Sequence, residues 1–431
     1  MATNWKTRSL RDLSIFLSRG VTPSYTESEG IRVLNQKCIR DQTVNFAPSR
    51  RTDTTKKNVS EDKLLKVNDI LINSTGEGTL GRVAQIKIIS EPTTVDSHVT
   101  ILRPNPLEVD PSFLGCVVRY LQPEIEMMAE GSTGQTELSR TRLGSLEIDL
   151  PSTNEQRQIA SILGAFDEKV AVNKRMNATL EAMARALFQS WFVDFDPVRA
   201  KLDGSKPVGI DESTAKLFPD TFQDSEIGNI PKGWTVKPIG EVVDCVGGGT
   251  PSTAEPKYWV GGTHHWTTPK DFSSLQSPIL LNTDRKLTDI GIAKISSGLL
   301  PAGTLLLSSR APVGYLAIAT MPVAINQGFI ALKCNEYASN YFMLNWCQSN
   351  MLEIESRATG TTFAEISKQN FRPIRVVLPS KDLMSAFTAK VEPLYEQITA
   401  NLIQSQTLTF LRDTLLPKLL SGELSVENLQ S

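Results

Sequence analysis

The stretch from Asn154 to Trp191 reads NEQRQIASILGAFDEKVAVNKRMNATLEAMARALFQSW and contains no proline. A strict seven-residue spacing joins a series of mostly apolar positions: Ile159, Phe166, Asn173, Leu180 and Leu187. We expect Ile162, Met176 and Met183 to complete the apolar seam, widened by Leu163 and Val170. This is the period of a coiled coil. A helix of about 38 residues is roughly 57 Å long. It needs a partner, because burying each large apolar side chain is worth about 1.5–3 kcal/mol.

A second copy of the same pattern lies 228 residues further along the chain. Thr22–Ser24 returns as Thr250–Ser252, and Leu150–Ser152 returns as Leu378–Ser380, both at this offset. The seven-residue series also returns, at Phe387, Leu394, Asn401, Leu408 and Leu415. Several matches in one order at one offset indicate a tandem repeat of a unit of about 228 residues. Asn173 and Asn401 share one position, where buried asparagines would fix the helix register; two solvated asparagines are the alternative.

Each copy begins with a mixed part, so the sequence predicts an α+β fold. Strands are expected at 69–73, 83–89, 99–102 and 146–150, with partners at 304–308, 315–319, 329–332 and 374–378. Helices are expected at 111–130 and 340–357. The predicted divisions are a first mixed domain, a long helix, a link rich in Pro, Gly, Asp and Ser, a second mixed domain, a second long helix and a tail: 1–152, 153–195, 196–233, 234–379, 380–420 and 421–431.

The composition limits the class of protein. The chain contains 45 Lys and Arg residues and 47 Asp and Glu residues, so its charges nearly balance. Hydrophobic residues make up 40% of it, which is typical of a globular chain. The five cysteines lie far apart without a CxxC pair, which favours a reducing, cytoplasmic compartment over a disulfide framework or a zinc site. No signal core or run of 18 apolar residues is present, so no membrane segment is expected.

Motifs for catalysis are missing from the sequence. It contains no phosphate-binding GxxxxGK[ST] loop, no GxGxxG after a strand, and no GxSxG or HExxH motif. The aromatic dipeptide flanked by Asn/Asp-Pro-Pro that amino-methyltransferases carry is also absent. His264 and His265 are adjacent, but neighbouring side chains on a strand diverge and no acidic partner is spaced around them. We therefore expect no catalytic residue, no metal site and no enzyme acting alone.

Polar loops in both copies are suited to reading DNA, because hydroxyl, amide and guanidinium groups bond to base edges and phosphates. An ordinary surface turn is the alternative for any one loop, but similar polar loops in both copies favour recognition. The candidate DNA-binding residues of the first copy are Thr22, Ser24, Lys37, Ser74, Thr75, Arg82, His98, Thr133, Gln135, Thr136 and Arg140. Those of the second copy are Thr250, Ser252, Lys270, Ser309, Arg310, Gln327, Thr361, Thr362 and Lys368.

The two copies diverge most in these loops, while their helices stay similar. Lys37 and Lys270 lie in different contexts, and Thr75 and Arg310 occupy roughly matching loops. The segment 50–57 adds a local basic patch that is suited to backbone contact, or is a solvated loop. Residues 1–150 contain 19 basic and 19 acidic residues, so this part alone would hold DNA weakly, because phosphate neutralisation supplies much of the affinity.

Six stretches of the sequence stand out together: ExRQIAxIL at 155–163, LFQSWFVDFDPV at 187–198, FPDTFQDSEIGNIPKGW at 218–234, LRDTLLPKLLSGEL at 411–424, NSTGEGTLGR at 73–82 and DSHVTILRP at 96–104. With these stretches, the chain resembles the specificity subunits of type I restriction–modification enzymes over nearly its whole length. The first of these motifs has no counterpart at 382–388.

The resemblance implies two target-recognition domains, each of which reads one half of an asymmetric, split site in double-stranded DNA. The two long helices would pack antiparallel as a spacer, with pseudo-twofold symmetry. Two modification (methyltransferase) subunits that bind S-adenosylmethionine and two motor–nuclease subunits that use ATP and Mg would join, while this chain would bind no cofactor. The alternatives are the specificity partner of a fused nuclease–methyltransferase, and a coiled-coil scaffold that binds only protein.

Overall fold

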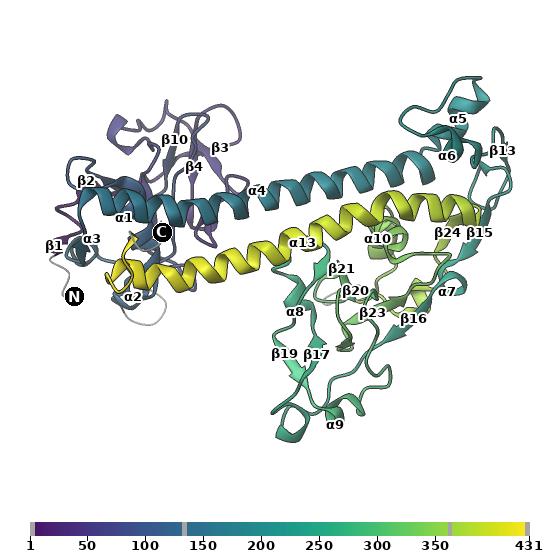
Figure 1. Cartoon of the computed structure of the whole chain (residues 1–431). Coiled ribbons are helices and arrows are strands. Elements are labelled where there is room, and N and C mark those ends of the chain that lie inside the picture. The colour runs from purple at the N-terminus through teal and green to yellow at the C-terminus, as the bar shows by residue number, and fades with distance from the viewer. Residues whose placement is uncertain (1–4, 132–135, 361–363, 427–431) are drawn as a thin grey trace. The chain divides into compact units, whose positions relative to one another are not determined.

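The computed structural model of the chain describes residues 5–131, 136–360 and 364–426 (Figure 1). The fold divides into two compact units, one made of Met1–Val170 with Gln406–Ser431 and the other of Ala171–Ser405. Each unit contains part of both long helices, α4 (Thr153–Phe192) and α13 (Lys381–Leu420). Helices and sheets are mixed in both units, which confirms the predicted α+β class.

The first unit is built on two four-stranded sheets, in the orders β2-β11-β8-β9 and β10-β4-β7-β3, and two strand pairs, β1-β12 and β5-β6. The strands are β1 (Lys6–Ser9), β2 (Ser14–Arg19), β3 (Tyr25–Thr26), β4 (Ile31–Leu34), β5 (Ile39–Arg40), β6 (Thr43–Val44), β7 (Arg50–Thr52), β8 (Ile70–Asn73), β9 (Val83–Gln85), β10 (Thr93–Val95), β11 (Val99–Pro104) and β12 (Glu147–Leu150). The helices are α1 (Pro111–Tyr120), α2 (Gln122–Met127), α3 (Arg140–Gly144) and two 3-10 turns, Gln36–Cys38 and Glu61–Lys63.

Apolar side chains join the first sheet of this unit to the start of α4. Ile70, Ile72 and Leu102 of the sheet share one core with Phe113 of α1 and Ile159 of α4. Asp110 caps α1 by accepting hydrogen bonds from the backbone N–H groups of Ser112 and Phe113, and Pro111 takes the first turn, as expected for a proline at this position.

The second unit repeats this plan with sheets in the orders β16-β23-β20-β21-β18 and β19-β17-β22, and strand pairs β15-β24 and β13-β14. The strands are β13 (Phe222–Gln223), β14 (Ile230–Pro231), β15 (Thr235–Pro238), β16 (Asp244–Gly247), β17 (His264–Thr267), β18 (Ile279–Leu280), β19 (Arg285–Leu287), β20 (Leu305–Ser309), β21 (Val313–Ala319), β22 (Val323–Ile325), β23 (Phe329–Lys333) and β24 (Arg375–Leu378). The helices are α5 (Asp196–Leu202), α6 (Glu212–Lys216), α7 (Ile239–Val242), α8 (Pro269–Phe272), α9 (Asp289–Ile292), α10 (Asn340–Ser349), α11 (Met351–Ser356), α12 (Lys368–Phe371) and a 3-10 turn at Pro256–Tyr258.

The strands expected from the sequence are present in both units. β8, β9, β11 and β12 lie at the four predicted places in the first unit, and β20, β21, β23 and β24 lie at their partners in the second. The segment 111–130, expected as one helix, is two helices, α1 and α2, and 340–357 likewise forms α10 and α11. Pro123 lies in the first turn of α2, where the missing N–H is not needed for an intrahelical bond.

The shared asparagine position lies at the contact between α4 and α13 in the second unit. Asn173 is fully buried, and its side-chain amide donates to Ser405 Oγ at 3.1 Å and Gln404 Oε1 at 2.9 Å. Asn401 donates in turn to Asn177 Oδ1 at 2.8 Å. Because Ser405 follows Asn177 by the repeat offset of 228, the contact is reciprocal between the two copies. The buried asparagine layer is thus confirmed, and the solvated alternative is wrong.

The predicted positions of Met176 and Met183 in the apolar seam are wrong. Their side chains are 38% and 52% exposed, whereas Asn177 and Ala184, one position further along, are buried. In this unit the buried residues Asn177, Ala184 and Trp191 keep the seven-residue spacing, so the second line of the seam lies four residues after each heptad position rather than three. α13 continues through Pro393 and Pro417, each of which removes one backbone hydrogen bond.

The segment after α4, expected as a surface link, is folded. α5, α6, β13 and β14 lie within it, and Phe218 and Trp234 are buried against the end of α4. The Trp191 ring meets Phe218 edge-on at 5.1 Å, and the Phe192 ring lies 5.9 Å from Trp234. The sequence missed this aromatic cluster because its members are not periodic.

A three-way ion contact joins the long helices to α1 in the first unit. Asp167 of α4 accepts from Arg119 of α1 at 2.7 Å and from Arg412 of α13 at 2.6 Å. Burial alone would raise the pKa of Asp167, but the two guanidinium groups reverse this effect and hold the pKa below its ordinary value. The carboxylate therefore stabilises the first unit in its charged form.

We predict that Asp167→Asn destabilises the first unit by about 2–3 kcal/mol at pH 7, because two largely buried guanidinium groups lose their counter-charge. A group with a lowered pKa stabilises above its unfolded pKa, about 3.9, and this stabilisation is lost as the pH falls through the folded pKa. Urea unfolding at pH 7 and below pH 4 should therefore show a difference between wild type and variant that shrinks in acid. Glu168→Gln, at the adjacent exposed position, is the control. A difference that stays constant with pH would contradict the assignment.

Candidate nucleic-acid interface

In the first unit, the predicted polar loops meet at one end of the strand pair β8–β11. Asn73 pairs with Val99, and beyond this pair Thr75 Oγ1 lies 2.8 Å from His98 Nδ1. Gln36 Nε2 donates to both Thr75 Oγ1, at 2.7 Å, and Thr75 O, at 2.9 Å. Thr75 Oγ1, which accepts from Gln36, can either donate to Nδ1 or accept from it, depending on the tautomer of His98. His98 itself is exposed, with Nδ1 directed to Thr75.

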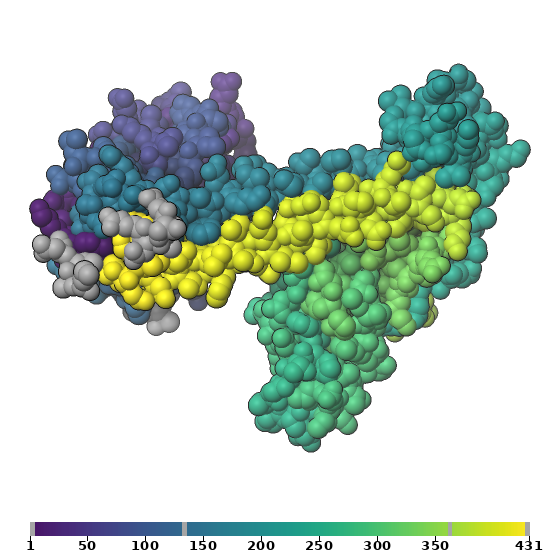
Figure 2. Space-filling model, in the orientation of Figure 1, coloured from purple at the N-terminus to yellow at the C-terminus, as the bar shows by residue number. Residues whose placement is uncertain are grey.

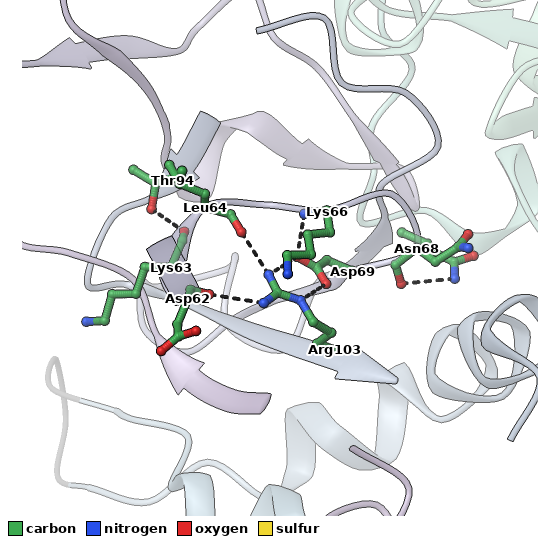
Figure 3. A network of polar contacts seen from close by, with 9 residues as sticks. Asp62, Lys63, Leu64, Lys66, Asn68, Asp69, Thr94 and Arg103 are labelled. Carbon is green, nitrogen blue, oxygen red and sulfur yellow. Dashed lines mark hydrogen bonds and ion pairs between the residues drawn. The ribbon is translucent and has the colours of Figure 1, made fainter. Parts of the chain in front are cut away.

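The other end of the same strand pair is held by a buried ion pair. Arg103 at the end of β11 donates to both carboxylate oxygens of Asp69, each at 2.8 Å, and to the backbone carbonyls of Asp62 and Leu64 (Figure 3). Asp69 also accepts from the backbone N–H of Lys66 at 2.8 Å. Since both strands are clamped at this end, the loops at their other end start from fixed positions. No pattern in the amino-acid sequence indicates this ion pair.

A buried carboxylate lies behind His98. Asp96 is 4% exposed, and its Oδ1 accepts from the backbone N–H of His98 at 2.9 Å. Burial raises the pKa of Asp96 above its ordinary value, although the N–H and the ring of His98 act in the opposite direction. Asp96 thus shapes the loop that carries His98, and sequence reasoning did not single it out.

Other predicted residues surround this group. Thr22 directly follows Val21, which bridges to Asp96, and Thr136 precedes Glu137, which bridges to Thr75. Lys37 lies exposed on the 3-10 turn that also carries Gln36. Arg82 closes the 74–82 loop by donating to Gly78 O at 2.8 Å. Arg140 lines a hollow of about 350 Å³ with Arg19 and Glu137. Ser24 lies further away, just before β3, where its backbone N–H donates to Thr52 Oγ1 at 2.9 Å.

In the second unit, a cleft of about 430 Å³ collects the corresponding side chains. Lys270, Arg310, Asn326, Thr268 and Tyr315 line it. Among the described residues, the Arg310 guanidinium makes one long contact, with Glu365 at 3.5 Å. Two cationic side chains therefore line one cleft.

Two further loops of this unit flank the cleft. Thr250 Oγ1 donates to Gln327 Oε1 at 2.5 Å, which joins the Thr250–Ser252 loop to the residue after Asn326. Lys368 lies apart on α12, against Gly247 at the end of β16.

Backbone hydrogen bonds align the two copies residue by residue. Val21 N donates to Val95 O and Gly249 N to Ile325 O, both at 2.9 Å. Asp96 is therefore equivalent to Asn326, and each accepts from the backbone N–H two residues later.

The same reasoning pairs other loop residues. Glu137 bridges to Thr75 and Glu365 bridges to Arg310, which confirms that Thr75 and Arg310 match. Lys37 and Lys270 both take the second position of a short helical turn capped by the residue two before them. We call these loop positions the polar edge of each unit. The backbone hydrogen bonds and bridges of the polar edge are the same in both units, whereas most of its side chains differ.

Two of the predicted DNA contacts are wrong. Ser74 is completely buried, with its hydroxyl 2.6 Å from Thr100 Oγ1, and Ser309 is 3% exposed. Their backbones instead pair with the returning strand, through Leu138 N and Ile366 N. Buried hydroxyls at these positions cannot reach a base edge. Four other predicted residues lie outside the described part of the chain: Thr133, Gln135, Thr361 and Thr362.

The remaining predicted residues are accessible. Fully exposed ones are Thr22, Lys37, His98, Thr136, Arg140, Thr250, Ser252, Lys270, Gln327 and Lys368, and partly exposed ones are Ser24, Thr75, Arg82 and Arg310. Accessibility permits contact with DNA, and the individual roles stay predictions.

The adjacent histidines do have one acidic neighbour, contrary to the sequence expectation. His264 Nε2 lies 2.6 Å from Asp289 Oδ1, whereas His265 Nδ1 lies near Thr283, at 3.2 Å. Their different partners agree with diverging side chains on β17. Across residues 5–131, 136–360 and 364–426, no group of three His, Cys, Asp or Glu side chains is placed to hold a metal ion. No helix in these ranges is long and apolar enough to cross a membrane.

A family model described as the type I restriction modification DNA specificity domain matches residues 2–182 and 231–404. The chain belongs to this family. The two matches cover the two tandem copies, and the members of this specificity family act in DNA recognition rather than catalysis.

Known members of the specificity family resemble the chain over nearly its whole length or over part of it. The type I restriction enzyme HindI specificity subunit of Haemophilus influenzae is 26% identical, over 98% of this chain and 100% of that protein. The MjaIX specificity subunit of Methanocaldococcus jannaschii is 35% identical over 37% of this chain and 38% of its own length. The crystal structure of the type I S subunit from M. genitalium shares the fold, with a TM-score of 0.56, 19% identity, and coverage of 97% and 96% of the two chains.

We predict that Arg310→Ala changes the sequence read by the second domain at one base position, with a loss of about 1–3 kcal/mol of discrimination there. The reason is that Arg310 is the equivalent of Thr75 and brings a planar guanidinium to the edge of the cleft. Sequencing of methylated sites in cells that carry each variant measures this. Ser309→Ala, at the buried neighbouring position, should leave the site unchanged. An unchanged site in Arg310→Ala would exclude Arg310 from base reading.

Proposed function

We propose that the chain is the non-catalytic sequence-specificity subunit of a type I restriction–modification complex, in which each mixed domain reads one half of a bipartite, asymmetric site in double-stranded DNA. One observation carries the proposal: two structurally equivalent polar edges present different side chains from the same framework. The first edge offers Thr75 and the exposed His98, and the second offers Arg310 and the partly exposed Asn326. Asp96, the equivalent of Asn326, is buried, and Gly328 takes the place of His98. Different hydrogen-bonding groups at equal positions suit two different half-sites.

The long helices would set the unread gap between the half-sites and bind the modification subunits. Part of their surface is apolar and open. Met183 of α4 is 52% exposed and Phe410 of α13 is 68% exposed. Figure 2 shows the side chains of α13, in yellow, at the surface over much of the helix. Exposed apolar side chains along a helix are suited to contact with another protein.

The chemistry of the complex would belong to its partners. Two methyltransferase subunits would bind S-adenosylmethionine, and two motor–nuclease subunits would use ATP and Mg, while this chain would bind none of these. All five cysteines are free thiols, which supports a location in the reducing cytoplasm.

The decisive experiment is to sequence the methylated sites of cells with and without this chain, in the presence of its modification subunit. We expect one split, asymmetric motif that is methylated only when the chain is present. Co-purification then separates the alternatives, since a single fused nuclease–methyltransferase would replace separate subunits. Absence of any chain-dependent motif would overturn the proposal and leave the protein-only scaffold.

Recognition should be modular. Replacing residues 1–150 with the corresponding domain of another specificity subunit is expected to change one half-site and leave the other intact. The reason is that this domain and the second mixed domain have separate cores. Methylated-site sequencing provides the measurement. A change in both half-sites would contradict independent reading.

Lengthening both long helices should widen the gap. Seven residues inserted in α4 before Asn173 and seven in α13 after Ser405 preserve the buried asparagine contacts. They add about 10.5 Å of helix, which corresponds to roughly three base pairs. We expect the same half-sites with a longer spacer in the methylated motif. The insertion in α4 alone, which breaks the helix register, is the control and should lower stability and methylation. An unchanged gap after the double insertion would exclude the spacer role.

A further inference from the structure

The sheets β10-β4-β7-β3 and β19-β17-β22 share a register that places one arginine at the same position in each unit. In the first unit, β4 pairs with β7 so that Val33 faces Arg50, and in the second, β17 pairs with β19 so that Trp266 faces Arg285. Leu34 and Thr267, the residues after Val33 and Trp266, receive the backbone hydrogen bonds of the equivalent Asp96 and Asn326. Arg50 and Arg285 therefore occupy one position of the repeated fold.

A glycine supports this equivalence independently. A Cβ on Gly30 would lie 2.3 Å from the carbonyl oxygen of Thr52, and a Cβ on Gly262 would lie 2.6 Å from the carbonyl carbon of Leu287. Thr52 and Leu287 each come two residues after the arginine. Both sheets thus require the same close backbone approach beside it.

Each arginine has its guanidinium carbon over an aromatic ring next to a Thr-Pro-Ser loop. The guanidinium carbon of Arg50 is 3.9 Å from the ring centre of Tyr25, which directly follows Ser24. That of Arg285 is 3.5 Å from the ring centre of Trp259. Trp259 Nε1 donates to Ser252 O at 3.0 Å, which ties this ring to the second loop. The two aromatic residues come from different positions in the sequence, yet they make the same contact.

The stacked guanidinium groups keep their N–H edges free. Arg50 has one long ion contact, 3.7 Å, with Glu27, whose carboxylate is 95% exposed and therefore weakly held. Within the described part of the chain, no hydrogen bond or ion pair engages the side chain of Arg285. Stacking fixes the plane of a guanidinium while leaving its donors available for an oxyanion.

We propose that Arg50 and Arg285 are equivalent DNA phosphate contacts, one in each recognition domain, each oriented by its aromatic ring beside the Thr-Pro-Ser loop. This inference rests on the proposed function. The neighbouring equivalent positions differ between the domains: Thr75 against Arg310, and His98 against Gly328. Two half-sites of different sequence share the same sugar–phosphate backbone. An arginine that is the same in both domains, while its neighbours differ, is therefore suited to contact this backbone.

The test uses the full chain in complex with its modification subunit, and measures binding to its own site and to unrelated duplex DNA over a range of salt concentrations. Arg50→Gln and Arg285→Gln remove the charge but keep a planar group that can stack. Each should weaken binding to both DNAs by a similar factor, roughly three- to ten-fold. Each should also lower the slope of log affinity against log salt by about one. Arg285→Lys should retain most of the slope. Lys6→Gln and Lys237→Gln, on the exposed strands β1 and β15, are matched charge controls and should leave the slope unchanged.

Three outcomes separate the possibilities. A wild-type slope in both glutamine variants, with or without a loss of thermal stability, would mean that the arginines only pack on their rings, and overturns the proposal. A methylated motif relaxed at one base position would mean base reading, and also overturns it. A wild-type complex that does not prefer its site would instead overturn the proposed function itself.

Discussion

The amide contact of Asn401 with Asn177 fixes the register of α4 against α13. Sliding one helix by a turn would place these buried amides against apolar side chains, and an unpaired buried polar group costs about 1–3 kcal/mol. The reciprocal contact of Asn173 with Ser405 doubles this constraint. The aligned helices then serve both cores: Ile159 packs in the first unit, and Phe188 and Phe387 pack in the second. Each recognition domain is therefore built on a helix pair whose alignment is set by polar groups rather than by its apolar seam.

Each domain combines a rigid frame with a variable edge. Strand pairs, glycine close approaches and backbone hydrogen bonds recur in the two units, so the loops begin and end at equivalent points. The means of stiffening differ, however: the first unit clamps β8 and β11 with the Asp69–Arg103 pair, which is fully surrounded by protein. The second unit holds its Thr250–Ser252 loop through tryptophan N–H groups. Because the strands are held by contacts outside the loop side chains, these side chains can be substituted without loss of the fold.

Sequence reasoning reached the architecture because repeats and periodic apolar residues report burial directly. It placed the eight strands near the equivalent edges, matched Thr75 with Arg310, and located the asparagine layer. It failed where a pattern of residue types does not determine which way a side chain faces, or which residues distant in the sequence come into contact. Ser74 and Ser309 lie in polar loops yet face the interior. Met176 and Met183 fit a heptad yet face solvent, because the buried seam of α4 runs through Asn177 and Ala184, one residue further along. The contact of Arg285 with an aromatic ring could not be predicted from the sequence, because its partner Trp259 lies 26 residues earlier.

The balanced charge of the recognition domains follows from this construction. Many cations of the first domain already have acidic partners: Arg51 pairs with Glu91, Arg19 with Glu137, and Arg103 with Asp69. Such pairs stiffen the frame but cannot also neutralise phosphates. The cations left for DNA are then few, among them Lys37, Lys270 and the stacked arginines. Since non-specific affinity grows with each phosphate neutralised, a domain with few free cations discriminates by its base contacts and leaves strong binding to the assembled complex.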